Sequence, residues 1–567
     1  MHKNENMNII GVMKNKLGLS RKQYFFRSFG ALVYPLFVFG FIKREGDNRW
    51  CNRNCYVSSL LFPVFLQRFF SQTLAKKKIV VSIIVAISAL CTFVILYQAN
   101  WIFGDDYLFM TKTAVNKYVD CRDFMFRGRF FPLGHFHYNF PLLLFRSLGI
   151  NTGFPVEGHF ALISIFFIVS YVCLYLLFNK IESSKNNKCL AFSLFFASTF
   201  FLFEGTLPMI FLRLIYPETQ IIVLFSIFML MYYKALETDK TRYYVIALLA
   251  VVYSTYCKEP VFGVFFVIVL INHLFRYKKE SKREKIFYMT LIANGVIFLI
   301  LYYFLSYRNA VSFYNESYEG KEVDMFRFLI PVFTKNPTLI IMFLLGLIRA
   351  YYIIVKNRKK QLYYDSLLFA GIAYVIAFIM LGLRWDYYFM PSIILFLPSF
   401  VYWTKYMYEK KRMYALCLFF VLLPIYTNNS TRAITTTKDI WRERQEFVPY
   451  ITNLLSEYND GKEFIWYTSK IVDTNTNYDD WEHYVLNIFF NHFNKSEKKE
   501  FFIVKGYSEN VELKDNALLF SLAGRIFDFE LIKTLQDNDF ELSKDNSYYP
   551  SSHYLRWVFI YTKKELK

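Results

Sequence analysis

Long apolar runs separated by short polar loops dominate the chain from residue 76 onward. A helix needs about 20 mostly apolar residues to cross a bilayer, and several of these runs are somewhat shorter. They lie at about 79–98, 159–178, 189–203, 218–234, 243–257, 261–275, 286–305, 337–355, 365–383, 389–404 and 413–427. The pattern predicts a mainly α polytopic membrane protein with about 11 transmembrane helices in residues 76–427.

Lysine and arginine recur in every second loop of this predicted bundle. Lys76, Lys77 and Lys78 precede the first run, and later clusters fall at 180–188, 240–242, 276–285, 356–360 and 410–412. Cytoplasmic loops carry an excess of these residues, so we place the clusters inside and the intervening loops outside. The first outer loop is then 99–158, and the odd number of spans places the C-terminus outside.

The segments on either side of the helical module have different patterns. Residues 1–75 contain two apolar stretches that are short for a span, and we expect them to lie in the cytoplasm or at its membrane surface; the alternative is an unstructured leader. Residues 428–567 have a helix-like stretch at 438–458 and short β-rich runs at 463–468, 501–505 and 554–562. They predict a small α/β extracytoplasmic C-terminal domain.

Composition supports the membrane assignment and argues against several other classes. Hydrophobic residues make up 55% of the 567 residues, against roughly 45–50% in soluble domains. The net charge of +21 is explained by the cytoplasmic loops, so we expect membrane lipids and no nucleic acid as partners. The eight cysteines show no zinc or disulfide pattern, and no Walker-type phosphate loop is present. We expect a multi-pass protein of the cell's inner (cytoplasmic) membrane.

The first outer loop opens with two adjacent carboxylates, Asp105 and Asp106, directly after the first span. Ionisable groups at this depth are functional candidates by default, because charge near the hydrocarbon region is costly. The alternative is that one aspartate caps a helix beginning at Tyr107. A cap needs only one carboxylate, so the other remains a candidate for chemistry.

Further polar residues lie at predicted outer helix ends, where lysine and arginine run against the charge bias. Guanidinium groups bind phosphate with two parallel hydrogen bonds, whereas lipid headgroup binding and surface salt bridges are the structural alternatives. His135 and His137 lack a positioned carboxylate partner, so no metal site is assigned to them. The candidates are Arg127, Arg129 and His135 in the first loop, and Arg213, Glu218, Lys258, Glu259 and Arg384 in later outer turns.

Five features occur together in this chain: an outer loop that opens with Asp105-Asp106, an amphipathic stretch behind it, about 11 spans, a late outer link around Arg384 and an outer C-terminal domain. In this combination the chain resembles the GT-C superfamily of membrane glycosyltransferases. Within it, the chain is most similar to bacterial glucosyltransferases that decorate O-antigen or other surface polysaccharides. The resemblance is architectural and covers residues 76–427. It implies that Asp105 or Asp106 acts as base or metal ligand, and that Arg384 meets the lipid-linked phosphate of the donor.

The residues suit transfer of a sugar from a polyprenyl-phosphate donor to a glycan or lipid acceptor on the outer face. A carboxylate assists deprotonation of the acceptor hydroxyl, and we favour Asp105 as this base. Arg384, Arg213 and Lys258 are candidates for stabilising the departing phosphate. Arg127, Arg129, His135, Glu218 and Glu259 are candidates for lining the cavity and binding acceptor. No cofactor is required, although a divalent cation at the aspartates stays open.

Two other hypotheses compete with this interpretation. One is a non-catalytic flippase or transporter of lipid-linked sugars, and the other is a surface polysaccharide polymerase or ligase. A flippase needs polar residues through the middle of its spans, whereas here they gather at the outer ends. The pattern therefore favours an enzyme of the cell envelope with an extracytoplasmic active site.

Overall fold

A computed structural model gives the fold. It describes residues 77–99, 109, 118–120, 125, 128–149, 156–182, 197–276, 280–308, 325–355, 361–381, 383, 385–410, 412–447, 449–450 and the five strands given below. Residues 1–75, which we predicted to lie in the cytoplasm or at its membrane surface, are outside the described residues.

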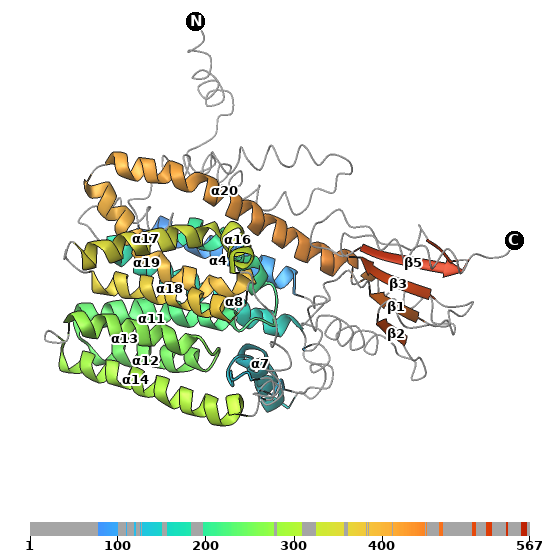
Figure 1. The fold of residues 1–567 in the computed structure, drawn as a ribbon, viewed down its shortest axis with the longest axis horizontal. Helices are drawn as coiled ribbons and strands as arrows, with labels where there is room; N and C mark the ends of the chain where they lie inside the picture. The colour runs from blue at the N-terminus through green and yellow to red at the C-terminus, as the bar shows by residue number, and fades with distance from the viewer. Residues whose placement is uncertain are drawn as a thin grey trace, which may run out of the picture. The chain divides into compact units, whose positions relative to one another are not determined.

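The apolar runs form helices (Figure 1). Most of the run at 189–203 lies outside the described residues. Its end is described and forms the π-helix η1 (Ser198–Leu202). The helices are α4 (Lys77–Tyr97), α7 (Phe136–Ser147), α8 (Val156–Glu182), α10 (Leu207–Phe211), α11 (Glu218–Thr238), α12 (Thr241–Thr255), α13 (Val261–Arg276), α14 (Lys282–Tyr302), α16 (Met325–Lys335), α17 (Pro337–Ile354), α18 (Leu362–Met380), α19 (Met390–Lys410) and α20 (Arg412–Arg442), with the short helices η3 (Tyr303–Tyr307), η4 (Asp386–Phe389) and η5 (Glu443–Phe447).

Five described helical segments are long and apolar enough to cross a membrane, which makes this a multi-pass membrane protein. They are 156–181, 218–238, 282–307, 337–354 and 362–380. Two shorter apolar helices, within α4 and α13, approach the same length. The mainly α fold class predicted from the sequence is confirmed.

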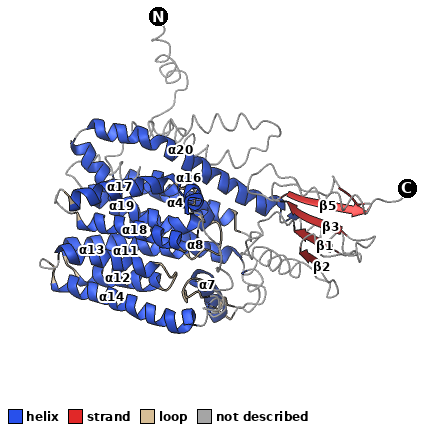
Figure 2. Ribbon diagram, viewed as in Figure 1, coloured by secondary structure: helices blue, strands red, loops and turns tan. Residues whose placement is uncertain are grey.

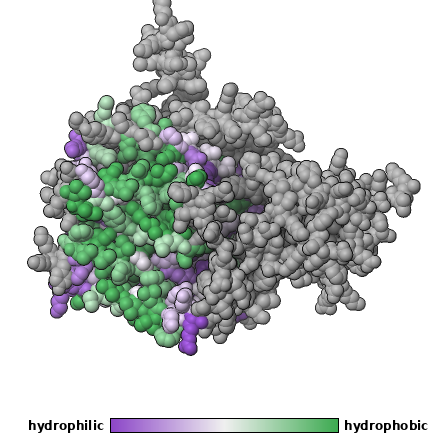
Figure 3. All heavy atoms as spheres, viewed as in Figure 1, coloured by the Kyte–Doolittle hydropathy of each residue, from purple (hydrophilic) through white to green (hydrophobic). Residues whose placement is uncertain are grey.

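The helices differ in how much of their surface other helices cover. α11 packs against α8, α12 and α19. In its apolar part 67% is buried inside the protein, against 22% for the segment that contains α14. α14 exposes large apolar side chains such as Met289 and Ile297. Figure 3 shows apolar residues spread over the visible face of the described helices, with polar residues toward its edges. This apolar surface suits contact with lipid chains.

α18 lies between α13, α17 and α19 and is held by one close approach and one buried ion pair. A Cβ atom added at Gly371 would lie 3.0 Å from the carbonyl oxygen of Ser392, so a larger residue would push α18 and α19 apart. Arg349 of α17 donates from Nε and Nη2 to the two carboxylate oxygens of Asp365 at 2.7 and 2.9 Å. The guanidinium also lies 4.0 Å from the ring centre of Trp403 in α19. One buried arginine thus joins three helices.

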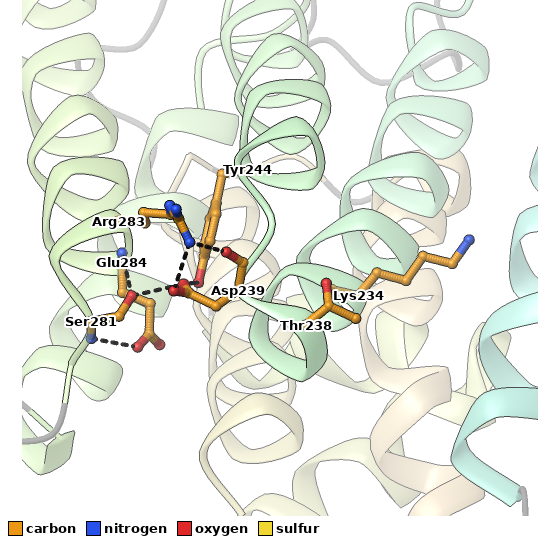
Figure 4. A network of polar contacts seen from close by, with 7 residues as sticks. All are labelled: Lys234, Thr238, Asp239, Tyr244, Ser281, Arg283 and Glu284. Carbon is orange, nitrogen blue, oxygen red and sulfur yellow. Dashed lines mark hydrogen bonds and ion pairs between the residues drawn. The ribbon is translucent and has the colours of Figure 1, made fainter.

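A polar network lies at the helix ends that the charge pattern predicts to face the cytoplasm (Figure 4). Asp239 adopts a left-handed conformation (φ 49°) after α11. Its carboxylate accepts hydrogen bonds from Ser281 at 2.9 Å and from Arg283 at 3.1 Å. Ser281 also begins α14 with a capping box, in which it exchanges hydrogen bonds with Glu284. The turn between α11 and α12 is therefore fastened to the start of α14.

The C-terminal segment contains a five-stranded mixed sheet (Figure 2). Its strands are β1 (Phe464–Thr468), β2 (Phe502–Lys505), β3 (Leu518–Ala523), β4 (Phe540–Leu542) and β5 (Trp557–Lys563), in the order β2-β1-β3-β5-β4. β1 is parallel to β2 and β3, and β5 is antiparallel to β3 and β4. β1, β2 and β5 match the predicted β-rich runs, whereas β3 and β4 were not predicted.

Two helices and one helix end also differ from the predicted pattern. α7 and α16 lie in segments where no span was predicted, and each contains an internal proline, at 141 and 331. α20 continues past residue 427, where the sequence places the end of the membrane module, and reaches Arg442. Apolar periodicity alone does not show this extension, because its second half is polar. The division of the chain into three regions remains a prediction.

The Arg349–Asp365 pair predicts a large effect on stability. Arg349→Met leaves a buried carboxylate without its cation, so we expect a loss of about 3–5 kcal/mol. Arg349→Met combined with Asp365→Leu recovers much of the loss, because both buried charges are gone. Thermal unfolding of the purified protein measures both effects. The matched control is Lys180→Gln in the exposed Lys180–Glu237 pair, with a loss of less than about 1 kcal/mol. Wild-type stability of Arg349→Met would contradict the role assigned to the pair.

Candidate active site

Residues 128–149 belong to the predicted first outer loop, and they are anchored on the start of α11 and on the turn between α12 and α13. The backbone N–H of Leu133 donates to the carbonyl of Tyr256 at 3.0 Å. The side-chain amide of Gln220 donates to the carbonyls of Leu133 and Gly134 at 3.1 and 2.7 Å. Its oxygen accepts a hydrogen bond from the Tyr253 hydroxyl at 2.9 Å. Gln220 therefore fixes the loop backbone to two membrane helices.

The loop approaches so closely at Gly134 that a side chain there would collide. An added Cβ would lie 2.5 Å from the Phe131 ring and 3.1 Å from the carbonyl oxygen of Cys257. The N–H of Gly134 donates to the carbonyl of Phe131 at 2.8 Å, which closes a turn around Pro132. This turn brings the 129–135 segment against residues 256–260.

Arg129 and Glu259 form an ion pair across this contact. Arg129 Nε donates to Glu259 Oε1 at 2.9 Å, and the same oxygen accepts the backbone N–H of Phe130 at 2.9 Å. Burial by itself would raise the pKa of Glu259, but the charge and hydrogen bond of Arg129 outweigh it and hold the pKa below its usual value. Glu259 is consequently ionised at neutral pH and orients both Arg129 and the loop backbone.

Lys258 and Glu218 form a second, fully buried ion pair, with side chains 3% and 0% exposed. Lys258 Nζ donates to Glu218 Oε1 and also faces aromatic rings, with ring centres at 4.1 Å for Tyr388, 5.5 Å for Phe378 and 5.7 Å for Tyr387. Burial lowers the pKa of Lys258, and the charge of Glu218 opposes this shift. We call these five residues the lysine box.

Arg213 lies beside the lysine box and is half-buried. Its Nη1 donates to the hydroxyl of Tyr216 at 3.2 Å. The Tyr216 ring in turn lies 4.2 Å, centre to centre, from the ring of Tyr387 in the box. Arg213 thus combines contact with the site and access to its surface.

His135 is buried among aromatic rings in the same loop. Its ring lies 5.2 Å from that of Phe109, 5.4 Å from that of Phe131 and 6.4 Å from that of His137. Burial lowers the pKa of His135 to about 3, assisted by the charges of His137, Arg129 and Lys258. His135 is therefore neutral at physiological pH and contributes a hydrogen-bonding group rather than a cation. Within the described ranges, no group of three or more His, Cys, Asp or Glu side chains is arranged to hold a metal ion.

Four of the predicted site residues lie outside the described residues: Asp105, Asp106, Arg127 and Arg384. The six others, Arg129, His135, Arg213, Glu218, Lys258 and Glu259, come from three separate turns and lie in one connected cluster. Phe109 is three positions after Asp106 and belongs to the same neighbourhood, since its carbonyl accepts a 3.0 Å hydrogen bond from Tyr138 and its ring contacts His135.

Two contributors to the site were not identified from the sequence. Gln220 looks like an ordinary polar residue in a span, and its role depends on carbonyls 86 and 87 positions away. Arg444 in η5 is buried and donates to the carbonyls of Gln98, at the end of α4, and Leu212, next to Arg213. Neither residue has a local sequence signal, because each binds backbone oxygens that are distant in the chain.

The chain matches no protein-family model and no curated protein. Among solved structures, ArnT from Cupriavidus metallidurans bound to undecaprenyl phosphate is similar with a TM-score of 0.40 and 11% identity, covering 86% of this chain and 98% of that chain. The Archaeoglobus fulgidus oligosaccharyltransferase in complex with Zn and sulfate gives a TM-score of 0.35 and 13% identity, covering 72% of this chain and 61% of that chain. Both are GT-C superfamily membrane glycosyltransferases. Similarity this low assigns neither an activity nor a residue role to this chain.

The lysine box gives a test of whether Lys258 stabilises the fold or binds phosphate. Lys258→Met leaves Glu218 buried without a cation, so we expect a loss of about 3–5 kcal/mol in the free energy of unfolding. Replacing both residues, as Lys258→Met with Glu218→Leu, recovers much of it. Arg213→Gln serves as the matched control, with a change below about 1 kcal/mol. Thermal unfolding decides the matter, and a Lys258→Met variant as stable as wild type would show that the pair is not structural.

Proposed function

We propose that this protein transfers a sugar from a polyprenyl-phosphate donor to a cell-surface glycan or lipid acceptor at the outer face of the membrane. One observation carries the proposal: charged and hydrogen-bonding residues from the first outer loop and two later outer turns meet in a single cluster at one end of the helices. A surface-level cluster suits a donor whose phosphate lies at the membrane surface. The chain also has no nucleotide-binding loop of the Walker type.

The positions of the ion pairs favour an enzyme over a flippase. Among the described helices, the pairs Arg129–Glu259, Lys258–Glu218 and Arg432–Asp386 lie at helix ends on the predicted outer side. Arg349–Asp365 and Arg283–Asp239 lie near the opposite ends. A path for a sugar headgroup needs polar groups through the middle of the spans. The described pairs instead lie near the ends of the helices.

The geometry divides the candidate cations into two groups. Lys258 already has a buried carboxylate partner, and Arg129 is paired with Glu259, so both support the site rather than offer charge to a ligand. Arg213 is half-buried, and its hydrogen bond to the Tyr216 hydroxyl places its guanidinium beside the lysine box. We therefore assign the donor phosphate to Arg213, together with Arg384, which directly precedes the Trp385 and Asp386 link.

The acceptor requires a base near its hydroxyl, a role we assign to Asp105, with Asp106 orienting the acceptor or capping a helix. In the sequence, Asp106 precedes by three residues Phe109, whose ring contacts His135. His135, Glu218, Glu259, Arg127 and Arg129 shape the acceptor side of the cavity. The reaction needs no cofactor; a divalent cation at the aspartates is the alternative arrangement.

A polysaccharide polymerase or ligase is the second candidate within the same chemistry. It would use a pyrophosphate-linked glycan and need more positive charge around the leaving group. In the described cluster most of the cations are already paired, which favours a donor with a single phosphate.

The two aspartates give the direct test. Asp105→Asn keeps the shape of the side chain but removes the proton acceptor, so sugar transfer should fall by about 10²–10⁴-fold. The assay uses purified protein, a polyprenyl-phosphate sugar and a glycan or lipid acceptor, and it follows the mass of the acceptor. Asn also caps helices well, so a purely structural aspartate predicts full activity for Asp105→Asn and Asp106→Asn. Full activity of both variants would refute the catalytic assignment, and donor movement without any product would support a flippase.

The phosphate assignment predicts a different kinetic effect. Arg213→Gln and Arg384→Ala should each raise the donor concentration needed for half-maximal rate by roughly tenfold or more, because each removes a charge-assisted hydrogen bond. Acceptor dependence should stay near wild type. Initial rates at varied donor concentration measure the effect, with Lys234→Gln on the cytoplasmic side as the control. An unchanged donor dependence in both variants would move the phosphate to other residues.

A further inference from the structure

A second polar cluster lies away from the lysine box and joins four parts of the chain. We call it the Glu204 cluster, and its members are Glu204 before α10, Asn336 and Thr338 at the start of α17, Asp386 of η4, and Asn429 and Arg432 of α20. Its core is buried: Glu204, Asn336, Thr338 and Asn429 are at most 5% exposed. α20 approaches closely here, because a Cβ atom added at Gly205 would lie 3.0 Å from the Cβ of Arg432.

Hydrogen bonds connect the cluster in two halves. Glu204 Oε2 accepts from the Thr338 hydroxyl at 3.1 Å and from the Asn429 amide at 2.9 Å, and that amide also donates to Thr338 at 2.8 Å. In the other half, Asp386 accepts from Arg432 at 2.6 Å and from Asn336 at 3.2 Å. Both halves therefore contain residues of α20 and of the start of α17.

The charges of the cluster do not balance. Glu204 and Asp386 are two carboxylates, and Arg432 is the one cation that interacts with them among the described residues. Arg432 forms a direct ion pair with Asp386, whereas the side chains that donate hydrogen bonds to Glu204, Thr338 and Asn429, are neutral. An uncompensated carboxylate in a buried site is costly, so one positive charge is required here.

The hydrogen-bonding capacity of the cluster points the same way. Three buried oxygens, Glu204 Oε1, Asn336 Oδ1 and Asn429 Oδ1, have no hydrogen-bond partner within the part of the chain that the structure describes. In each of these three side chains, the other polar atom forms a hydrogen bond with another member of the cluster. Buried acceptors without a donor are rare in folded proteins. A bound cation or a proton supplies what such oxygens lack.

We propose that the Glu204 cluster binds one small positive charge, either a proton on Glu204 or a monovalent metal ion held by its carboxylate and amide oxygens. A proton on Glu204 Oε1 turns an acceptor into a donor, and a monovalent ion accepts several oxygen ligands at once. Occupation stabilises the contact between α20, α17 and η4. Because Asp386 is followed directly by Tyr387 and Tyr388 of the lysine box, the same contact supports the candidate active site.

The titration of Glu204 agrees with this geometry. Burial raises its pKa from 4.5 to about 7, and Thr338, Arg432, the Gly205 backbone and Asn429 only partly oppose the shift. The groups facing it are Arg432 and neutral Asn429 from α20 and neutral Thr338 from α17, while Asp386 of η4 is paired with Arg432 in the other half of the cluster. The folded protein therefore binds the proton more tightly than the unfolded chain. The resulting stability is fully present below about pH 4.5 and is lost as pH rises through about 7.

Thermal unfolding of the purified protein in lipid nanodiscs, without donor, tests the proposal independently of the transfer reaction. The apparent Tm is measured at about pH 5.5 and about pH 8 in choline chloride, and again with sodium or potassium replacing choline at constant ionic strength. If the charge is a proton, Tm falls between the two pH values by on the order of 5 °C whatever the salt. If it is a metal ion, sodium or potassium raises Tm at about pH 8 in a saturable manner.

Glu204→Gln assigns the effect, because its amide supplies a donor without charge. We expect this variant to lose both the pH and the cation dependence, whereas Glu237→Gln, in an exposed ion pair, keeps them. The proposal is overturned if the wild-type Tm changes with neither pH nor the added cation. It is also overturned if the Tm of Glu204→Gln depends on pH and cation as in the wild type. If Glu204→Gln does not fold, Thr338→Val removes the hydroxyl that favours the carboxylate. It should raise the pH midpoint or change the half-saturating cation concentration, and unchanged values of both also overturn the proposal.

Discussion

The cost of placing charge in an apolar environment is the constraint on which this structure depends. Among the residues that the structure describes, the buried lysine and arginine side chains have specific partners: Lys258 has Glu218, Arg349 has Asp365, and Arg444 has two backbone carbonyls. An unpaired charge at such a position would cost several kcal/mol, which is a large part of the stability of a typical domain. The partners come from different helices or loops, so satisfying the charges also fixes how those elements pack.

This constraint explains why the candidate site has its shape. The first outer loop stays on the helix ends because Gln220 binds its carbonyls and Glu259 binds both Arg129 and the Phe130 backbone. The small volume of Gly134 lets these contacts form at short range. The ion pairs therefore fix the arrangement of the site, and half-buried Arg213 contacts the lysine box through Tyr216. A rigid arrangement of this kind suits catalysis, which depends on groups held in place before the substrate arrives.

The sequence showed which charged residues lie at helix ends better than it showed which partner each of them has. Lysine and arginine at predicted outer helix ends run against the usual charge bias, which selected Arg129, Arg213 and Lys258. Carboxylates beside prolines at helix ends selected Glu218 and Glu259, and the structure brings these five residues together. These signals could not say that Lys258 is neutralised by a residue 40 positions earlier, or that Arg129 is paired 130 positions away. The Glu204 cluster shows the same limit, since its six members span residues 204 to 432.

The helices were determined by the sequence itself, because apolar length is a local property and a membrane span has a narrow range of lengths. β1, β2 and β5 were also visible as local β-rich runs, whereas β3 and β4 gave too weak a pattern. Only the tertiary structure decided the extension of α20 beyond its apolar part, the close approach at Gly134 and every ion-pair partner. These features depend on which distant residues meet, and the energy of such a contact belongs to the pair rather than to either residue.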